Sequence, residues 1–214
     1  MTPVELLIFD LDGTLIDSKR DLAASVDYTL DSLGLPRLPP EEIYAYIGDG
    51  IHTLLFRSLP SGDKGLLEEA VKLFRSHYGI HLLDTTCLYP GVQETLNHFH
   101  KKKKAIATNK PLDFTLTILK DLGIEAYFDV VLGFESTENR KPHPEPVERI
   151  LRELGVSSGS AVVVGDSPAD IEMGRRAGTI TCAMTYGLRG REELERAGPD
   201  FLLDGFSELA RIFV

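Results

Sequence analysis

The 214-residue sequence predicts an α/β protein whose parallel-sheet core is interrupted by an all-helical insert. Strand-length apolar runs alternate with helical segments from residue 89 onward, which is typical of a parallel sheet covered on both faces. Between about residues 18 and 84 there is helical periodicity but no convincing strand. We therefore expect two domains, an α/β core from residues 1–16 and 85–214 and a helical domain from residues 17–84.

The amino-terminal part predicts one strand followed by four helices. The apolar run at residues 4–9 has the length of a strand and ends at a carboxylate. Apolar residues then recur at steps of three and four, which predicts helices over residues 20–33, 41–47, 51–59 and 65–83. Glycine-containing breaks at residues 48–50 and 60–62 separate the last three of these helices.

The remainder of the chain predicts strands that follow helices in regular alternation. We expect helices over residues 91–101, 112–122, 144–154 and 168–177, strands over 104–108, 128–132, 160–165 and 179–184, then a short strand at 201–204 and a closing helix at 206–212. The carboxyl ends of parallel strands share one edge of the sheet, where open α/β sheets bind ligands. Residues just after each strand are therefore the candidates for a functional site.

Composition limits the classes of partner and compartment. The net charge of −10 argues against nucleic acid as a partner, although a small phosphorylated ligand remains compatible. Cys87 and Cys182 are far apart and form no disulfide framework, which fits a reducing, cytoplasmic environment. We expect no membrane span and no signal peptide. Nothing in the sequence demands a partner chain, so a monomer or weak homodimer is expected.

Two carboxylates, Asp10 and Asp12, follow the first strand. For Asp10 and Asp12 to serve one ligand, the backbone must turn after the strand, and Gly13 permits such a turn. Asp166 likewise stands at the tip of an apolar strand, where burial of a carboxylate needs compensation. A hard divalent cation shared with Asp10 would supply it, and oxygen ligands suit Mg²⁺. The alternative for the first pair is an ordinary polar turn.

Two other strand ends carry groups with two interpretations each. Thr108 and Asn109 precede a helix whose N-terminus can bind an anion, but Asn109 can equally be a simple helix cap. Lys141 lies in a proline-rich loop and can neutralise a phosphoryl group, or it is a solvated loop lysine. Ser167 and Asp170 have the spacing of a capping box.

Four motifs occur in one order along the chain: Asp10-x-Asp12-Gly13-Thr14, Thr108-Asn109-Lys110, Lys141-Pro142-His143-Pro144 and Gly165-Asp166-Ser167-x-x-Asp170. With these motifs the sequence resembles the haloacid dehalogenase-like hydrolase superfamily, in the subgroup with a helical cap inserted after the first strand. Within that subgroup it is similar to the phosphoglycolate phosphatases. The resemblance spans nearly the whole chain and implies a Rossmann-like core. Arg140 is a small departure, because glycine or lysine often precedes the lysine of the third motif.

The resemblance implies roles for the carboxylates. Asp10 would be the nucleophile that forms an aspartyl-phosphate, and Asp12 would first protonate the leaving alkoxide and then deprotonate a water molecule. Mg²⁺ would be held by the Asp10 side chain, the Asp12 backbone carbonyl and Asp166. Asp12 also favours phosphoryl transfer over dehalogenation, because a halide leaving group needs no proton.

The resemblance also implies how the phosphoryl group is held. Thr108 and the Asn109 backbone would bind its oxygens, and Lys141 would stabilise its charge. Asp170 would pair with Lys141 and lie behind the metal ligands.

Substrate choice is expected to lie in the helical cap. Gly48, Asp49 and Gly50 form a loop that can approach a substrate closely, with His52 as a further candidate contact, unless the loop is a plain interhelical turn. The expected substrate is a small phosphate monoester, 2-phosphoglycolate by resemblance. The alternatives are an inorganic pyrophosphatase, a sugar-phosphate phosphatase or phosphoglucomutase-like enzyme, and, from another class, a non-catalytic binding module with the same fold.

Overall fold

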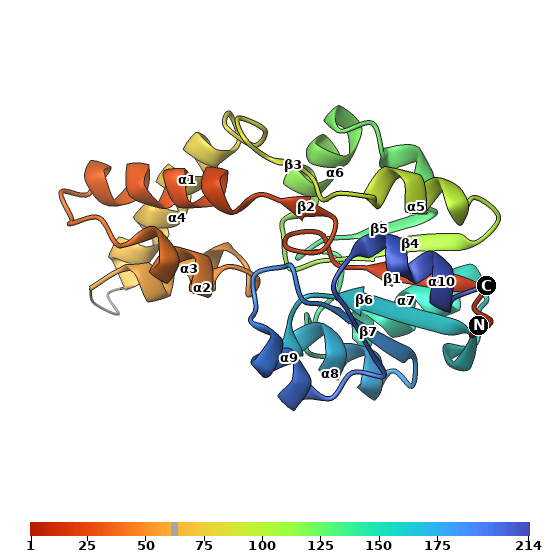
Figure 1. Ribbon diagram of the computed structural model, residues 1–214. Coiled ribbons are helices and arrows are strands. Elements are labelled where there is room, and N and C mark those ends of the chain that lie inside the picture. The colour runs from red at the N-terminus through yellow and green to blue at the C-terminus, as the bar shows by residue number, and fades with distance from the viewer. Residues whose placement is uncertain (61–63) are drawn as a thin grey trace. The chain divides into compact units, whose positions relative to one another are not determined.

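The computed structural model describes residues 1–60 and 64–214, and it divides into two compact units. Met1–Asp17 together with Leu88–Val214 form the α/β unit, and Ser18–Cys87 form the helical unit (Figure 1). The break expected at residues 60–62 lies mostly outside the described residues. Within the described part of the chain, no helix has both the length and the apolar character needed to cross a membrane.

The α/β unit is built on a six-stranded sheet. In spatial order the strands are β5 (Val130–Leu132), β4 (Lys103–Ala107), β1 (Leu6–Phe9), β6 (Ala161–Gly165), β7 (Ile180–Met184) and β8 (Phe201–Leu203). Every neighbouring pair is parallel, which confirms the predicted sheet type. Phe9 is level with Ile106 on one side and with Val164 on the other. The loops that follow β1, β4 and β6 therefore begin side by side at one edge of the sheet.

Helices cover both faces of this sheet (Figure 1). They are α5 (Val92–His98), α6 (Leu112–Asp121), α7 (Glu145–Leu154), α8 (Pro168–Arg176), α9 (Arg191–Ala197) and α10 (Leu209–Ile212), with short 3₁₀ helices η1 (Glu125–Tyr127), η2 (Ser158–Ser160) and η3 (Phe206–Glu208). Sequence periodicity did not predict α9, because the helix is short and polar and buries only Leu194. The short pair β2 (Ile16–Asp17) and β3 (Cys87–Leu88) was also not predicted.

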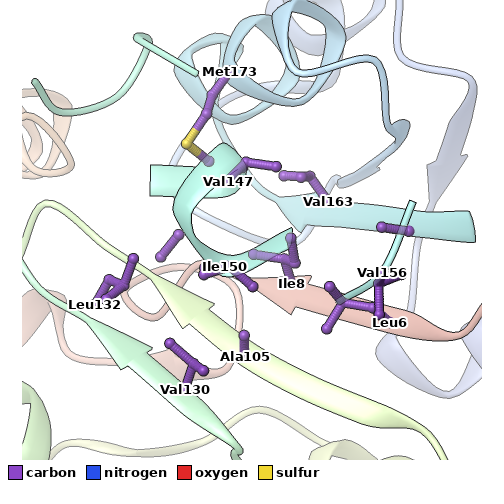
Figure 2. Close-up of a cluster of buried hydrophobic side chains, with 12 residues drawn as sticks. Leu6, Ile8, Ala105, Val130, Leu132, Val147, Ile150, Val156, Val163 and Met173 are labelled. Atoms are coloured by element: carbon purple, nitrogen blue, oxygen red, sulfur yellow. The ribbon is translucent and has the colours of Figure 1, made fainter. Parts of the chain in front are cut away.

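Burial of β1 on both faces fixes the position of the residues that follow it. Leu6 and Ile8 pack against Val147 and Ile150 of α7 in one fully buried cluster (Figure 2). Phe9 points to the opposite face, where its ring lies 5.6 Å from that of Phe206. Successive strand residues alternate between faces, so a continuous apolar run is what a central parallel strand requires.

The connection between α5 and β4 differs from the prediction. The sequence predicted a helix to residue 101, but α5 stops at His98, and Lys104 in β4 is buried. The Lys104 ammonium donates hydrogen bonds of 2.7 Å to the carbonyl oxygens of Phe99 and Lys102. The carbonyls after the helix end thus satisfy an ammonium that is buried away from solvent.

The described residues of the helical unit form four helices: α1 (Lys19–Ser32), α2 (Pro40–Tyr46), α3 (Ile51–Ser58) and α4 (Lys64–Tyr78). They bury one apolar face each, with Val26, Phe74 and Tyr78 fully enclosed. The fourth helix ends five residues earlier than the predicted residue 83. Gly79 follows its last residue, and glycine weakens a helix at that point.

Asp21 ties the two ends of the helical unit together. Its buried carboxylate in the first turn of α1 accepts hydrogen bonds from the backbone N–H and the hydroxyl of both Thr85 and Thr86, at 2.6 to 3.0 Å. Burial alone would raise the pKa of Asp21, but these hydrogen bonds outweigh it and the pKa is lowered. The carboxylate is thus held in its charged form, with a donor for each oxygen.

Replacing Asp21 by alanine should lower the free energy of unfolding by about 1–3 kcal/mol, because four donors lose their common acceptor. Urea denaturation followed by circular dichroism measures this change. Asp31→Ala is the matched control, since Asp31 lies on the same helix but forms an exposed pair with Arg37. That control should cost clearly less than Asp21→Ala, because solvent screens an exposed ion pair. Equal losses in the two variants would contradict the structural role of Asp21.

Candidate active site

The α/β unit gathers charged side chains from several strand ends at one edge of the sheet. Asp10 and Asp12 follow β1, Thr108, Asn109 and Lys110 follow β4, Asp166 follows β6, and Lys141 comes from the loop between β5 and α7. All of them are buried. Ion pairs between groups this far apart in sequence show that the parallel register brings the motifs together, as the strand-end argument predicted.

A tight turn places Asp12 at the same edge as Asp10. Gly13 has a φ of 85°, and its N–H donates to the carbonyl of Ile16 at 2.9 Å. A Cβ on Gly13 would lie only 2.2 Å from Oδ2 of Asp166. Glycine is therefore required here twice, for the left-handed backbone and for the close approach of Asp166.

Lys141 joins the first motif to the fourth. Its Nζ lies 2.7 Å from Oδ1 of Asp10 and 2.7 Å from Oδ1 of Asp170. The other oxygen of Asp170 accepts hydrogen bonds from the N–H and the hydroxyl of Ser167, which completes the predicted capping box at the start of α8. Asp170 therefore caps a helix and fixes Lys141 with different oxygens, and Lys141 is not a solvated loop lysine.

The charges around Lys141 shift its own pKa and that of Asp10. Burial lowers the pKa of the Lys141 ammonium, but the charges of Asp10 and Asp170 outweigh that effect and raise it above its ordinary value. Burial raises the pKa of Asp10 to about 6, although Lys141 opposes the rise. Lys141 therefore stays protonated, and its charge favours the anionic form of the Asp10 carboxylate.

Asp166 is the most strongly perturbed carboxylate at this edge. Its Oδ1 accepts from the Thr14 hydroxyl at 3.2 Å and its Oδ2 from the Leu188 N–H at 2.7 Å. Burial, followed by repulsion from Asp10 and Asp170, nevertheless raises its pKa to about 8. Two neutral donors do not offset the cost of burying this charge among other anions.

The donor set fits a hard divalent cation. Asp10, Asp166 and Asp170 each offer a carboxylate oxygen, and these oxygens lie within 4.8 Å of one another. Both oxygens of Asp170 already bind Lys141 or Ser167. Asp10 and Asp166 are therefore the side chains that best suit a cation with oxygen-only ligands.

Sequence reasoning missed two contributors to this edge. Lys110 was quoted within a motif but given no role, yet its Nζ lies 2.9 Å from Oδ1 and 3.1 Å from Oδ2 of Asp12. The loop after β7 was not considered at all. It supplies the Leu188 N–H to Asp166, and Tyr186 donates its hydroxyl to the Thr14 carbonyl at 2.6 Å. The strand-end rule, applied to the strand at residues 179–184, would have indicated this loop.

The Asn109 capping interpretation was wrong. Helix α6 begins at Leu112, its N-cap is Pro111, and no side chain caps it. Pro111 therefore precedes the helix and does not lie in its first turn. Thr108, in contrast, uses its hydroxyl oxygen to accept the N–H of Lys110 at 3.3 Å. Its own hydroxyl proton can then point toward an anion.

The predicted loop at residues 48–50 belongs to the helical unit, between α2 and α3. Gly48 and Gly50 have φ values of 114° and 85°, so the turn needs both glycines. Asp49 pairs with Nη1 of Arg57 at 2.6 Å, and both side chains are partly exposed. The predicted residues are thus divided: Gly48, Asp49, Gly50 and His52 lie in the helical unit, and the others lie together in the α/β unit.

Comparison with known proteins agrees with this arrangement. The family model for haloacid dehalogenase-like hydrolases matches residues 7–184. The chain belongs to this family. A phosphoglycolate phosphatase of Aquifex aeolicus is 38% identical over 211 residues, which are 98% of this chain and 96% of that protein. Another, from Haemophilus influenzae, is 36% identical over 221 residues, with 99% of each chain covered.

A solved structure gives the same result for the whole chain. A protein from Haemophilus somnus, described as a predicted phosphoglycolate phosphatase, superposes with a TM-score of 0.94 at 31% identity and covers 99% of both chains. Family membership and full-length relatives of this kind confirm the expected enzyme class. The chain is a phosphoric monoester hydrolase of the haloacid dehalogenase-like family.

The raised pKa of Asp166 predicts how metal-free protein responds to pH. Its pKa is about 8 in the folded protein against 3.8 ordinarily, so between these values the folded state binds more protons than the unfolded chain. The free energy of unfolding should therefore fall as pH rises toward 8 and then level off. Between pH 5 and pH 8 in EDTA, the free energy of unfolding of Asp166→Asn should rise by at least about 1 kcal/mol relative to that of the wild type, because the variant lacks this titration. Urea titrations at four pH values measure this, and parallel pH curves would contradict it.

Gly187 should be essential for the placement of Asp166. A Cβ there would lie 2.4 Å from Cβ and Oδ2 of Asp166. We expect Gly187→Ala to weaken the binding of a divalent cation at least about 10-fold, measured by isothermal titration calorimetry with Mg²⁺ as the probe, because the carboxylate must move. Gly190→Ala is the matched control, since nothing lies within 4 Å of its Cβ position. Unchanged affinity in Gly187→Ala would show that Asp166 tolerates the displacement.

Proposed function

We propose that this enzyme is a Mg²⁺-dependent phosphatase that hydrolyses 2-phosphoglycolate through an aspartyl-phosphate on Asp10. The observation that carries the proposal is the buried contact of Lys141 with Asp10, beside Asp166 at the same sheet edge. A nucleophilic carboxylate must be anionic and desolvated, and this contact favours the anion inside a buried site. The substrate assignment is supported by relatives named phosphoglycolate phosphatase at 34–38% identity over nearly the whole chain.

In the first step the Asp10 carboxylate attacks phosphorus. A bond forms between its Oδ and phosphorus while the bond to the ester oxygen breaks. The Asp12 carboxyl gives its proton to the departing alkoxide, which makes the alcohol the leaving product. Asp10 and Asp12 are separated by one residue and a tight turn, so a nucleophile and an acid are available at one strand end.

In the second step a water molecule attacks the phosphorus of the aspartyl-phosphate. Asp12, now a carboxylate, takes the proton from this water. The bond between Asp10 and phosphorus breaks, inorganic phosphate leaves, and the Asp10 carboxylate is restored. One side chain thus serves as acid and then as base, and the protonation state of Asp12 returns to its starting point.

Hydrogen-bond donors and a cation bind the phosphoryl oxygens. The Thr108 hydroxyl accepts the Lys110 N–H and therefore offers its own proton, and the Asn109 backbone lies beside it. Lys141 stabilises the equatorial charge that develops during transfer. Asp170 contacts the Lys141 ammonium and keeps it at this place.

Mg²⁺ would be held by the Asp10 and Asp166 side chains and by the Asp12 backbone carbonyl. When bound, it supplies positive charge that offsets the repulsion between a carboxylate nucleophile and a phosphoryl group. The turn of Gly48, Asp49 and Gly50 in the helical unit is part of the proposal as the substrate-selecting element. The reactant is a small phosphorylated metabolite, and neither nucleic acid nor a membrane takes part.

A substrate panel tests the proposal. It comprises 2-phosphoglycolate, pyrophosphate, sugar phosphates including glucose phosphates, and nucleotides, each with Mg²⁺ and with EDTA. We expect the highest kcat/KM for 2-phosphoglycolate and loss of activity in EDTA. Asp10→Asn should lower kcat at least about 10³-fold because the nucleophile is gone. Asp121→Asn, at an exposed position on α6, is the control and should retain full activity.

The outcomes of the panel separate the alternatives. If kcat/KM is clearly highest for pyrophosphate, the enzyme is a pyrophosphatase that uses the same site residues. If it is highest for a sugar phosphate, the substrate assignment changes but the mechanism does not. Turnover by Asp10→Asn at the wild-type rate would refute the aspartyl-phosphate mechanism. Absence of turnover on every substrate would favour a binding module.

A further inference from the structure

Lys110 forms a buried ion pair that the proposed chemistry has not used. Its ammonium faces both carboxylate oxygens of Asp12, at 2.9 and 3.1 Å, and its side chain is only 3% exposed. The contact connects the loop after β1 with the loop after β4, and these strands are neighbours in the sheet. An exposed lysine pair contributes little, but a buried pair with two oxygen contacts fixes the orientation of its partner.

The backbone of Lys110 is itself anchored. Its N–H donates to the Thr108 hydroxyl at 3.3 Å, and its carbonyl accepts the Phe134 N–H at 2.9 Å. Pro111 follows and restricts the conformation of Lys110. The ammonium therefore extends from a fixed point, and it holds Asp12 relative to the phosphoryl-binding Thr108.

The two buried lysines at this edge contact different acids. The described ion pairs join Lys141 to Asp10 and Asp170, and join Lys110 to Asp12. Lys141 is thus associated with the nucleophile, whereas Lys110 is associated with the proton-transferring residue. The two lysines have separate tasks, so removing one should not reproduce the loss of the other.

We propose that Lys110 is a positioning residue that holds the Asp12 carboxyl group where it exchanges protons with the leaving group and with water. This inference rests on the proposed function, in which Asp12 is the acid and base. Proton transfer needs heavy atoms within about 2.6–3.2 Å, so a carboxyl group that rotates freely spends little time in reach. A cation facing both oxygens restricts that rotation.

The inference predicts a dependence on the leaving group. The alkoxide of 2-phosphoglycolate needs a proton to leave, whereas p-nitrophenolate leaves well without one. The ratio kcat/KM reports steps only up to departure of the leaving group, so later hydrolysis of the aspartyl-phosphate does not enter it. Loss of Lys110 should therefore lower kcat/KM much more for 2-phosphoglycolate than for p-nitrophenyl phosphate.

The experiment compares Lys110→Met with the wild type on both substrates at saturating Mg²⁺. We expect kcat/KM to fall at least about 10²-fold for 2-phosphoglycolate and less than about 10-fold for p-nitrophenyl phosphate. Lys110→Arg keeps the cation and should recover part of the loss on 2-phosphoglycolate. It also provides the measurement if the methionine variant does not fold. Lys120→Met, at an exposed position on α6, is the matched control and should behave as the wild type.

Asp12→Asn separates failure of this inference from failure of the proposed function. If Asp12→Asn keeps full activity on 2-phosphoglycolate, the role assigned to Asp12 is wrong whatever Lys110 does. If Asp12→Asn loses activity while Lys110→Met loses none, or loses equally on both substrates, the positioning role is overturned. The double variant should lose no more than Asp12→Asn alone, because both changes disable one function.

Discussion

Mutual repulsion among buried carboxylates is the constraint on which the functional edge depends. The acids are Asp10, Asp12, Asp166 and Asp170, and the only lysines in the described ion pairs with them are Lys110 and Lys141. When all four acids are ionised, these two lysines leave a formal charge of −2, which a divalent cation would balance. Burying even one unpaired carboxylate costs several kcal/mol, so the set is tolerable only if charges of opposite sign remain in contact. The raised pKa of Asp166 marks the position where compensation by the protein alone is weakest.

The parallel sheet meets this constraint through register. Phe9 is level with Ile106 and Val164, so the loops after β1, β4 and β6 begin side by side. β1 is buried on both faces, which leaves Asp10 little freedom to move away from its neighbours. The two pairings that matter most, Lys141 with Asp10 and Lys110 with Asp12, each join loops from different strands. The register of the sheet therefore also brings the paired charges together.

The sequence predicted the parallel sheet, the helical insert and the strand ends that carry Asp10, Asp166 and Lys141, because these follow from periodicity and from the geometry of parallel strands. Periodicity and strand geometry did not predict which lysine meets which acid: the pair of Lys141 with Asp170 was expected only from the resemblance, and the pair of Lys110 with Asp12 was not expected. Lys104 lies within β4 and Lys110 follows it, yet Lys110 pairs with Asp12 and Lys104 binds two carbonyls. That difference depends on which groups the fold leaves unsatisfied nearby, and local sequence carries no record of it. The contribution of Gly187 was missed for the same reason: only glycine fits at this position because Asp166 lies where a Cβ would be.

Asp170 shows why the structural and the functional interpretation of a motif need not compete. One of its oxygens completes a capping box with Ser167 and starts α8, while the other fixes the ammonium of Lys141. Because the helix holds the carboxylate, Lys141 gains a rigid partner in addition to Asp10. In the proposed mechanism the same ammonium stabilises the charge of the phosphoryl group. Helix capping and charge placement thus use one side chain, and a change that disturbs the cap would also move the cation beside Asp10.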